Sequence, residues 1–495
     1  MQLPTTRPGL SRRQLAAGAG ALSLLPLYAA WQASRNARVI EPPAAVAVPA
    51  VAVPAAQAIV PAVFIEELKQ RSFRFFWETT DTRTGLAPDR WPSPSFASIA
   101  ATGFALTSYP IGVARGWITR EEARARTLTT LRFFHQAPQG ADVAGVAGYK
   151  GFFYHFLDTA TGARFGQCEL SPIDTTLLLA GALHCQSFFD GADAEETQIR
   201  TIVDELYARV EWSWLQQRSL LFARGWHPET GFIDNDWAGY SEAKLMYLLA
   251  LGSPSMPVDA GTWGALTASY GEGWGTEYGQ TYLRFAPLFG HQFTHAWVDL
   301  RGIADPYMRE RGIDYFENSR RATLAQRAYA IANPDGWAGY GADVWGITPS
   351  DGPADVHLEY NGKVRKFMSY AGRGMAEWDD GTIAPYGAGS SIVFAPELVT
   401  RALTTMRERY GEKIYGRYGF MAFNPSFTFG DVPLRHGRVE PGIGWINTDY
   451  VGIEVGPLLA MLANHRDELV WKDMRKNAHL KQGLQRAGFT GGWLG

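Results

Sequence analysis

Apolar positions recur at helical spacing along most of the chain beyond residue 61. Residues three and four positions apart share one face of a helix, so this recurrence predicts helices that bury one side. The pattern covers residues 64–78, 121–135, 173–189, 195–215, 242–251, 320–332, 391–410 and 450–465. Two of these helices have recognisable starts, because Thr119 precedes two glutamates and Ser171 precedes a proline.

The predicted helices are separated by long connections rich in glycine and tryptophan, without the strand and helix alternation of a doubly wound sheet. A weak repeat places an acidic residue and a following Thr-Gly at residues 81–85, 158–162 and 229–231. The interval is roughly 70 to 77 residues, which suits one helical hairpin with its loops. Repeated helical hairpins that close on themselves form a toroid, so we expect an all-α barrel.

The first 61 residues differ in composition from the rest. The pair Arg12-Arg13 precedes an apolar run over residues 15–30, which is typical of a twin-arginine export signal and too short for a confident membrane span. We therefore expect a signal segment over residues 1–40 and a periplasmic or secreted protein without stable membrane insertion. Residues 41–61 are rich in Ala, Val and Pro and predict a linker. One catalytic domain then spans residues 62–495.

Composition narrows the classes of partner. The net charge is only −3, which does not favour nucleic acid. The chain has 17 Trp, 21 Tyr and 27 Phe, and aromatic faces that stay half-exposed are suited to stacking against sugar rings. Cys185 falls in an apolar helical pattern, so we favour free thiols for Cys168 and Cys185. We expect an oligosaccharide or polysaccharide as partner, a monomer, and neither cofactor nor metal.

Cleavage of a glycosidic bond requires a proton donor and a second carboxylate, so acids in aromatic, glycine-rich segments are the candidates. Glu169 stands just before a predicted helix, and Asp174 lies in its first turn. A carboxylate there also interacts favourably with the positive helix end, so capping explains these two acids as well as catalysis does.

Glu242 is the second candidate. It follows Ser241 at the start of a strongly apolar helix, which raises the pKa of a carboxyl toward that of a general acid. Trp237 and Tyr240 precede it and offer faces for stacking on sugars.

Residues 289–299 place His291 and Gln292 between aromatic residues, where both could bind sugar hydroxyls. The spacing of His291 and His295 also occurs in metal sites, but the remaining ligand pattern is missing.

Three more segments combine acids with aromatic residues before a predicted helix: 315–320, 376–385 and 444–454. They contribute the candidates Glu377, Trp378, Trp445 and Asp449. In a barrel of helical hairpins such segments meet at one end, so together we expect them to line a substrate cleft.

Several of these segments resemble a known family. Residues 151–158, 169–175, 240–254 and 380–385 are similar to the glycoamylase-like domain, which occurs in bacterial endo-β-1,2-glucanases and in cyclic β-1,2-glucan synthases. The resemblance covers nearly everything after Phe64. It implies an (α/α)6 barrel and, for a hydrolase of this family, cleavage of β-1,2-glucan or a related β-glucoside with inversion.

Site roles follow from the same resemblance. It implies Glu242 as the general acid and Asp174 or Asp449 as the general base, with Glu169 behind them. Tyr154, within the first matching segment, joins the expected substrate-binding residues.

Other functions stay open at this stage. They are a transglycosylase, an exo-acting β-glucosidase on related glycans, a polysaccharide lyase and a non-catalytic periplasmic glucan-binding protein. The candidate segments are acidic rather than basic, which counts against the lyase.

Overall fold

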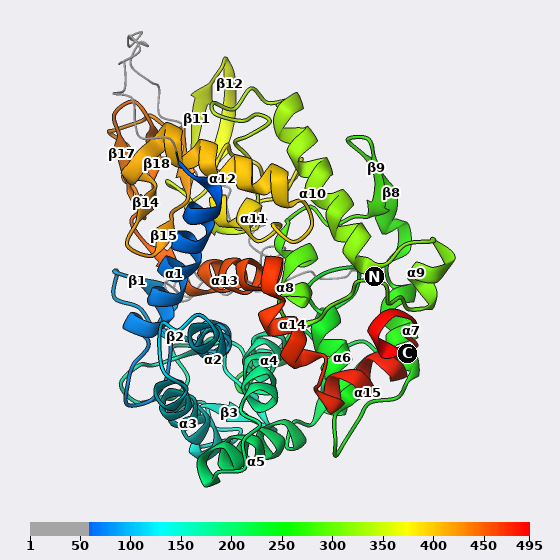
Figure 1. Cartoon of the computed structure of the whole chain (residues 1–495). Helices are drawn as coiled ribbons and strands as arrows, with labels where there is room; N and C mark the ends of the chain where they lie inside the picture. Colours follow the sequence, from blue (N-terminus) through cyan, green and yellow to red (C-terminus); the bar gives the residue numbers. More distant parts are fainter. Residues whose placement is uncertain (1–58) are drawn as a thin grey trace, which may run out of the picture.

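The computed structural model describes residues 59–495 (Figure 1). The predicted export signal lies outside these residues, as does nearly all of the predicted linker. The first helix, α1, begins at Pro61, one residue before the expected start of the domain. The single-domain boundary at residue 62 otherwise stays a prediction.

Within the described residues, six helices form an inner ring. They are α2 (Ile99–Ala114), α4 (Pro172–Phe188), α6 (Lys244–Gly252), α8 (Phe289–Trp297), α11 (Pro385–Gly389) and α13 (Gly452–Asp467). α2 packs against α4 and α13, α4 packs against α6, and α13 packs against α8 and α11. Most residues of these helices are buried, as expected for helices enclosed on all sides.

An outer ring surrounds them. It consists, in the described chain, of α1 (Pro61–Thr79), α3 (Arg120–Gln136), α5 (Ala194–Ala208), α7 (Gly261–Ala268), α10 (Tyr315–Ala332) and α12 (Pro396–Tyr410). Outer and inner helices alternate along the sequence, and α1 also packs against α12, which closes the ring. The architecture is the expected all-α (α/α)6 barrel (Figure 1).

The closest helix contact in the barrel is made by glycines. A Cβ on Gly103 of α2 would lie 2.2 Å from the carbonyl oxygen of Leu177 in α4. A Cβ on Gly181 of α4 would lie 2.0 Å from the carbonyl oxygen of Gly103. The backbones of α2 and α4 therefore touch without intervening side chains, which holds two inner helices at one fixed separation.

Smaller helices complete the chain. They are α9 (Pro306–Glu310), α14 (Leu469–Met474), α15 (Ala478–Arg486) and the 3₁₀ turns Trp212–Leu215, Gly271–Gly273, Gly411–Lys413 and Gly492–Leu494. α14 packs against α4 and α8, and α15 packs against α6. The C-terminal segment thereby ties several inner helices together.

The strands are short, antiparallel and confined to connections. The pairs are β1 (Arg90–Trp91) with β19 (Tyr450–Val451), β2 (Ala97–Ser98) with β5 (Phe156–Leu157), β3 (Gly148–Tyr149) with β4 (Phe152–Phe153), β6 (Trp226–His227) with β7 (Gly231–Phe232), β8 (Trp274–Glu277) with β9 (Gln280–Leu283), β10 (Ser350–Asp351) with β13 (Tyr370–Ala371), β11 (Val356–Tyr360) with β12 (Lys363–Phe367), and β14 (Tyr415–Gly416) with β15 (Gly419–Phe420). A three-stranded sheet joins β16 (Phe423–Asn424), β18 (Gly444–Ile446) and β17 (Arg438–Glu440). Pairs such as β1 with β19 join connections that are far apart in sequence.

The predicted helices agree with the structure wherever one face is polar. Three boundaries were wrong: the helix expected to reach residue 215 ends at Ala208, the one expected from residue 320 begins at Tyr315, and the one expected from residue 391 begins at Pro396. Four helices of the two rings were not predicted: α2, which is apolar on nearly every side, and the short helices α7, α8 and α11.

Cys168 and Cys185 are both free and buried, as the sequence favoured. Between residues 59 and 495, no helix has both the length and the apolar composition required to cross a bilayer.

Candidate active site

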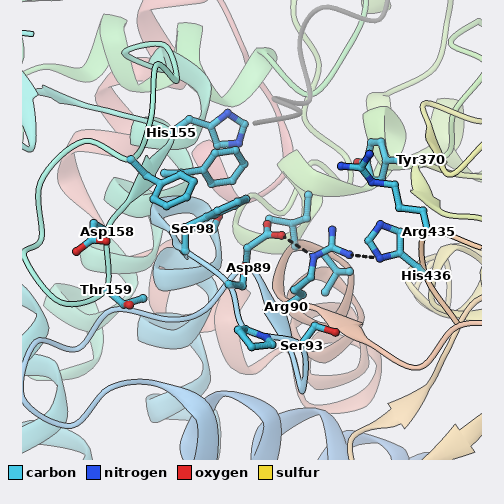
Figure 2. Close-up of a pocket in the computed structure, with 17 residues that line it drawn as sticks. Asp89, Arg90, Ser93, Ser98, His155, Asp158, Thr159, Tyr370, Arg435 and His436 are labelled. Atoms are coloured by element: carbon cyan, nitrogen blue, oxygen red, sulfur yellow. Dashed lines mark hydrogen bonds and ion pairs between the residues drawn. The ribbon is translucent and has the colours of Figure 1, made fainter. Parts of the chain in front are cut away.

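Three adjoining hollows form a groove at one end of the barrel. The largest of the three, here called the Arg90 cavity, has a volume of about 660 Å³, and its lining includes Arg90, His155 and Tyr370 (Figure 2). The Glu242 pocket, of about 240 Å³, contains Glu242 and Asp174 in its wall. A narrow neck between them shares Ile453 with the Arg90 cavity, and it shares Phe289, Phe293 and Pro349 with the Glu242 pocket.

The starts of the inner helices provide the acids of this groove. Asp174 lies in the first turn of α4 and Glu454 in the first turn of α13, while Glu242 stands two residues before α6. The N-terminal end of a helix carries partial positive charge, which favours a carboxylate there. The fold therefore gathers acids from separate hairpins at one end.

Glu242 is buried, with 8% of its surface exposed, and its Oε2 has no hydrogen-bond partner in the described structure. The walls around it are largely apolar and include Trp237, Phe285 and Phe293. Burial raises the pKa of Glu242 to about 7, although the charge of Lys244 acts in the opposite direction. A carboxyl with this pKa can hold a proton near neutral pH and release it to a leaving oxygen.

Asp174 faces the same pocket as Glu242. The hydroxyl of Ser171, the cap of α4, donates a hydrogen bond to its Oδ2, and its Oδ1 lies 3.5 Å from Nε2 of His155. Burial raises the pKa of Asp174, while the charge of His155 and the Ser171 hydrogen bond lower it. Asp174 therefore both contacts the cap of α4 and lies in the pocket wall. The sequence alone could not distinguish a capping role from a catalytic one.

Glu169 lies behind Asp174 and does not line the groove. Its Oε1 is 2.9 Å from Nδ1 of His155. Among the described residues, His155, Glu169 and Asp174 form a group whose potential ligand atoms lie within 4.8 Å of one another. Both ring nitrogens of His155 point at carboxylates, so a doubly protonated ring satisfies the group, and such a ring has no lone pair to offer a metal.

Asp449 lies beside the Arg90 cavity and not in the wall of the Glu242 pocket. Its Oδ1 accepts a hydrogen bond of 3.0 Å from the backbone N–H of Ser93, and its Oδ2 is 3.9 Å from Nη1 of Arg90. The structure thus separates two carboxylates that the sequence treated as equal candidates for the base.

Arg90 is the centre of charge in its cavity. Its Nη1 lies 2.9 Å from Oδ2 of Asp351. The same Nη1 lies 3.3 Å from Nδ1 of His436, and Nε lies 3.4 Å from Oδ2 of Asp89 (Figure 2). Arg90 is therefore the shared cationic partner of three carboxylates, Asp89, Asp351 and Asp449.

Two expected substrate-binding residues are accessible. Glu377 and Trp378 line the Glu242 pocket, and Trp378 is 41% exposed. The backbone of Ala376 and of Trp378 has a positive φ, of 59° and 51°, a conformation that residues other than glycine rarely adopt. Trp237 also lines the pocket, although only 3% of its surface is exposed.

Five other residues expected to bind substrate are buried, and their role in binding stays a prediction. Tyr240 covers the ammonium of Lys244, whose Nζ lies 3.7 Å from the ring centre. Nε2–H of the buried His291 donates a hydrogen bond to the backbone carbonyl of Phe285, and burial lowers the pKa of His291 to about 3. Gln292 reaches the neck, but its amide nitrogen donates to α11 and to Ser391.

Tyr154 and Trp445 are likewise in the core. Tyr154 lies under the guanidinium of Arg164, and the indole N–H of Trp445 donates to the carbonyl of His436. Polar groups between aromatic residues are as typical of a buried helix or strand as of a sugar site, so the sequence pattern could not distinguish the two.

Sequence reasoning missed much of the groove. The missed residues are Asp89, Arg90, His155, Asp351, Tyr370, Tyr386, Arg435, His436 and Glu454. Glu454 and His155 did fall in segments that the sequence had marked. Glu454 has an unpartnered Oε1 among the described residues, and burial together with the nearby Asp351 raises its pKa well above the usual value. Arg90 and Asp351 are 261 positions apart, so local patterns could not connect them.

Comparisons with known proteins agree with this architecture. The family described as "Glycoamylase: Putative glucoamylase" matches residues 234–478. The chain is 27% identical over 455 residues to an exo beta-1,2-glucooligosaccharide sophorohydrolase (non-reducing end) of Parabacteroides distasonis. That match covers 85% of this chain, which spans only 57% of the length of the relative.

Two solved structures superimpose over most of the barrel. An endo-beta-1,2-glucanase from Chitinophaga pinensis, with sophorotriose and glucose, has a TM-score of 0.74 and 25% identity, covering 88% of this chain and 100% of that one. A structure described as a putative glucoamylase from Bacteroides uniformis has a TM-score of 0.75 and 26% identity, with 89% and 100% covered. The chain therefore matches the glycoamylase-like family over residues 234–478 and has the (α/α)6 barrel of these structures.

Proposed function

We propose that this protein is a glycoside hydrolase that cleaves β-1,2-linked glucan with inversion at the anomeric carbon. The observation that carries the proposal is the position of Glu242 and Asp174 in the wall of one pocket, with Glu242 protonatable near neutral pH. The substrate class is supported by relatives named as a sophorohydrolase and as an endo-beta-1,2-glucanase.

The two acids divide the reaction between them. Glu242 gives its proton to the glycosidic oxygen as the bond to the anomeric carbon breaks. Asp174 takes a proton from a water molecule whose oxygen attacks that carbon from the opposite face, which produces the inverted hemiacetal. The enzyme ends with Glu242 ionised and Asp174 protonated, and solvent exchange restores both.

The rest of the groove binds the chain on either side of the cleaved bond. Trp378 presents an exposed indole face to the Glu242 pocket, which suits stacking on a glucosyl ring. The Arg90 cavity supplies hydrogen-bonding groups, including Arg435 and Asp158, for sugar hydroxyls. The groove therefore accommodates several glucosyl units.

Product analysis tests the proposal. The protein is incubated with linear β-1,2-glucan, beside laminarin, cellulose and starch, and proton NMR records the anomer that appears first. We expect products from β-1,2-glucan alone, released as the α-anomer. Disaccharide as the first product indicates exo cleavage, whereas a range of lengths indicates endo cleavage.

Other outcomes contradict the proposal. Longer or cyclic products indicate a transglycosylase, and an unsaturated, ultraviolet-absorbing product indicates a lyase. Binding of the glucan without cleavage indicates a glucan-binding protein. Cleavage of starch in place of β-1,2-glucan transfers the activity to α-glucans.

We also propose export by the twin-arginine route to the periplasm or the medium. The support is the Arg12-Arg13 pair before the apolar run of residues 15–30. A fusion of residues 1–61 to a reporter should be exported, and replacement of both arginines by lysine should retain the reporter in the cytoplasm. Unchanged export of the lysine variant contradicts this route.

A further inference from the structure

His155 lies in the wall of the Arg90 cavity, while its partner Asp174 lines the Glu242 pocket. The ring of His155 is held between two buried carboxylates, with Nδ1 at 2.9 Å from Glu169 and Nε2 at 3.5 Å from Asp174. We propose that His155 is a positioning residue that keeps Asp174 ionised and oriented as the general base. This inference rests on the function proposed above.

The ring is fixed by its surroundings. The backbone N–H of His155 donates to the carbonyl of Glu169 at 3.0 Å, and its own carbonyl accepts from Ile99 at the start of α2 at 3.3 Å. The imidazole stacks on Phe156, with centroids 3.9 Å apart and planes 21° apart. Rotation of the ring away from the carboxylates would break this packing.

The geometry requires a charged ring. A neutral imidazole has one N–H and one lone pair, so one of the two carboxylates would face a lone pair. An imidazolium donates toward both. Burial alone lowers the pKa of His155, but Asp174 and Glu169, with Asp89 behind them, outweigh burial and raise it to about 9.

The charge of His155 matters because of the other groups around Asp174. Burial raises the pKa of Asp174 and the charge of Glu169 raises it further, whereas His155 and the hydroxyl of Ser171 lower it. Asp174 also repels Glu242 across the pocket. The net pKa of Asp174 is raised even so, and without the imidazolium only hydrogen bonds would oppose burial and the like charges. The pKa would then rise further, and Asp174 would be protonated over more of the pH range in which it must accept a proton from water.

The first test compares His155→Gln with His184→Gln in the full chain. His184 is a matched control, because it is a buried histidine in α4 with Nε2 at 3.5 Å from a carboxylate, Asp473. We expect His155→Gln to lower kcat on β-1,2-glucan by about 10- to 100-fold with KM nearly unchanged. The loss should be smaller than the full contribution of a general base, about 10²- to 10⁴-fold, because Asp174 itself is still present. The control should keep both values.

The pH profile separates positioning from a merely structural role. Loss of the positive charge raises the pKa of Asp174, so the acidic limb of kcat should move to higher pH in His155→Gln. A loss of kcat that is equal at every pH, with an unmoved limb, overturns the proposal. So does a variant with wild-type kcat.

A second test does not depend on activity. The chain has 10 histidines, and ¹⁵N NMR reports the charge of each imidazole as a function of pH. We expect one histidine to stay charged above pH 8, and its signal should be absent from His155→Gln. If that variant does not fold, Glu169→Gln should lower the same pKa. No histidine charged above pH 8 overturns the proposal.

The two proposals fail in different ways. A wild-type chain that keeps a charged histidine but cleaves no glycan overturns the hydrolase function, and with it the catalytic role of His155. A wild-type chain that cleaves β-1,2-glucan but keeps His155 neutral overturns only the inference about His155.

Discussion

The Glu242 pocket and the Arg90 cavity are neighbouring parts of one groove, but they treat carboxylates differently. In the pocket, Glu242 has an unpartnered oxygen and apolar neighbours, and its pKa rises to about 7. In the cavity, Asp351 and Asp449 surround the guanidinium of Arg90, at 2.9 Å and 3.9 Å. Carboxyl groups thus face apolar walls in the pocket and a guanidinium in the cavity.

This difference indicates which acids can take part in catalysis. A buried carboxyl among apolar neighbours has a raised pKa and can transfer a proton, whereas a carboxylate paired with arginine is held in place as a hydrogen-bond acceptor. The pocket therefore suits bond cleavage, and the cavity suits binding of sugar hydroxyls. Five predictions test this division, in order of decreasing effect.

Glu242→Gln should abolish most turnover. The amide keeps the shape of the side chain but cannot donate the required proton, so kcat should fall by about 10³- to 10⁴-fold. Binding of β-1,2-glucooligosaccharides, measured by calorimetry, should survive. A kcat within tenfold of the wild type would remove Glu242 from the role of general acid.

Asp174→Asn and Asp449→Asn compare the two candidates for the base. Asp174→Asn should lower kcat by about 10²- to 10³-fold, because the pocket loses its proton acceptor. Asp449→Asn should mainly raise KM, since Asp449 contacts Ser93 and Arg90 beside the larger cavity. Steady-state kinetics on both variants measures the difference, and the reverse order of effects would assign the base to Asp449.

Arg90→Met should destabilise the fold. Removing the guanidinium leaves Asp89, Asp351 and Asp449 without compensation, and loss of one partner from a buried ion pair costs about 3 kcal/mol. Chemical denaturation should show a lower free energy of unfolding. Lys476→Met, at an exposed ion pair with Asp473, is the control and should change it little. Equal stability of both variants would contradict the charge-compensation model.

The pH dependence of kcat/KM should show a basic limb near pH 7. Glu242 must be protonated to act as the acid, and burial raises its pKa to about 7. Activity should therefore fall as pH rises through this value, approaching about tenfold per pH unit. Activity that is constant to pH 9 would contradict the assignment of the pocket as the acid site.

Trp378→Ala should have the smallest effect. The indole is 41% exposed, so its loss should leave stability nearly unchanged. Stacking on a sugar ring should be lost, and KM should rise by about tenfold at little cost to kcat. Trp274→Ala is a control tryptophan outside the groove lining. An equal KM for Trp378→Ala and the wild type would exclude Trp378 from substrate binding.

Much of the fold could be read from periodicity. The outer helices α1 and α3 have one polar face, and both ends of each were predicted within a few residues. The inner helix α2 was missed because it is apolar on nearly every side, and α8 was missed because it has only nine residues. The site shows a similar limit: Asp174 and Glu242 stand at helix starts, whereas Arg90 lies in no segment that the sequence marked, and the partners of His155 come from the fold.

The sequence by itself determined that helical hairpins follow one another along the chain and that acids stand at the starts of apolar helices. Only the tertiary structure decided which acids face one another, because Asp174 and Glu242 meet in one pocket while Asp449 lies beside Arg90. It also decided which aromatic residues are accessible, leaving Trp378 exposed and Trp445 buried. The physical reason is that pKa and accessibility depend on neighbours across the barrel, and these neighbours come from hairpins hundreds of residues apart.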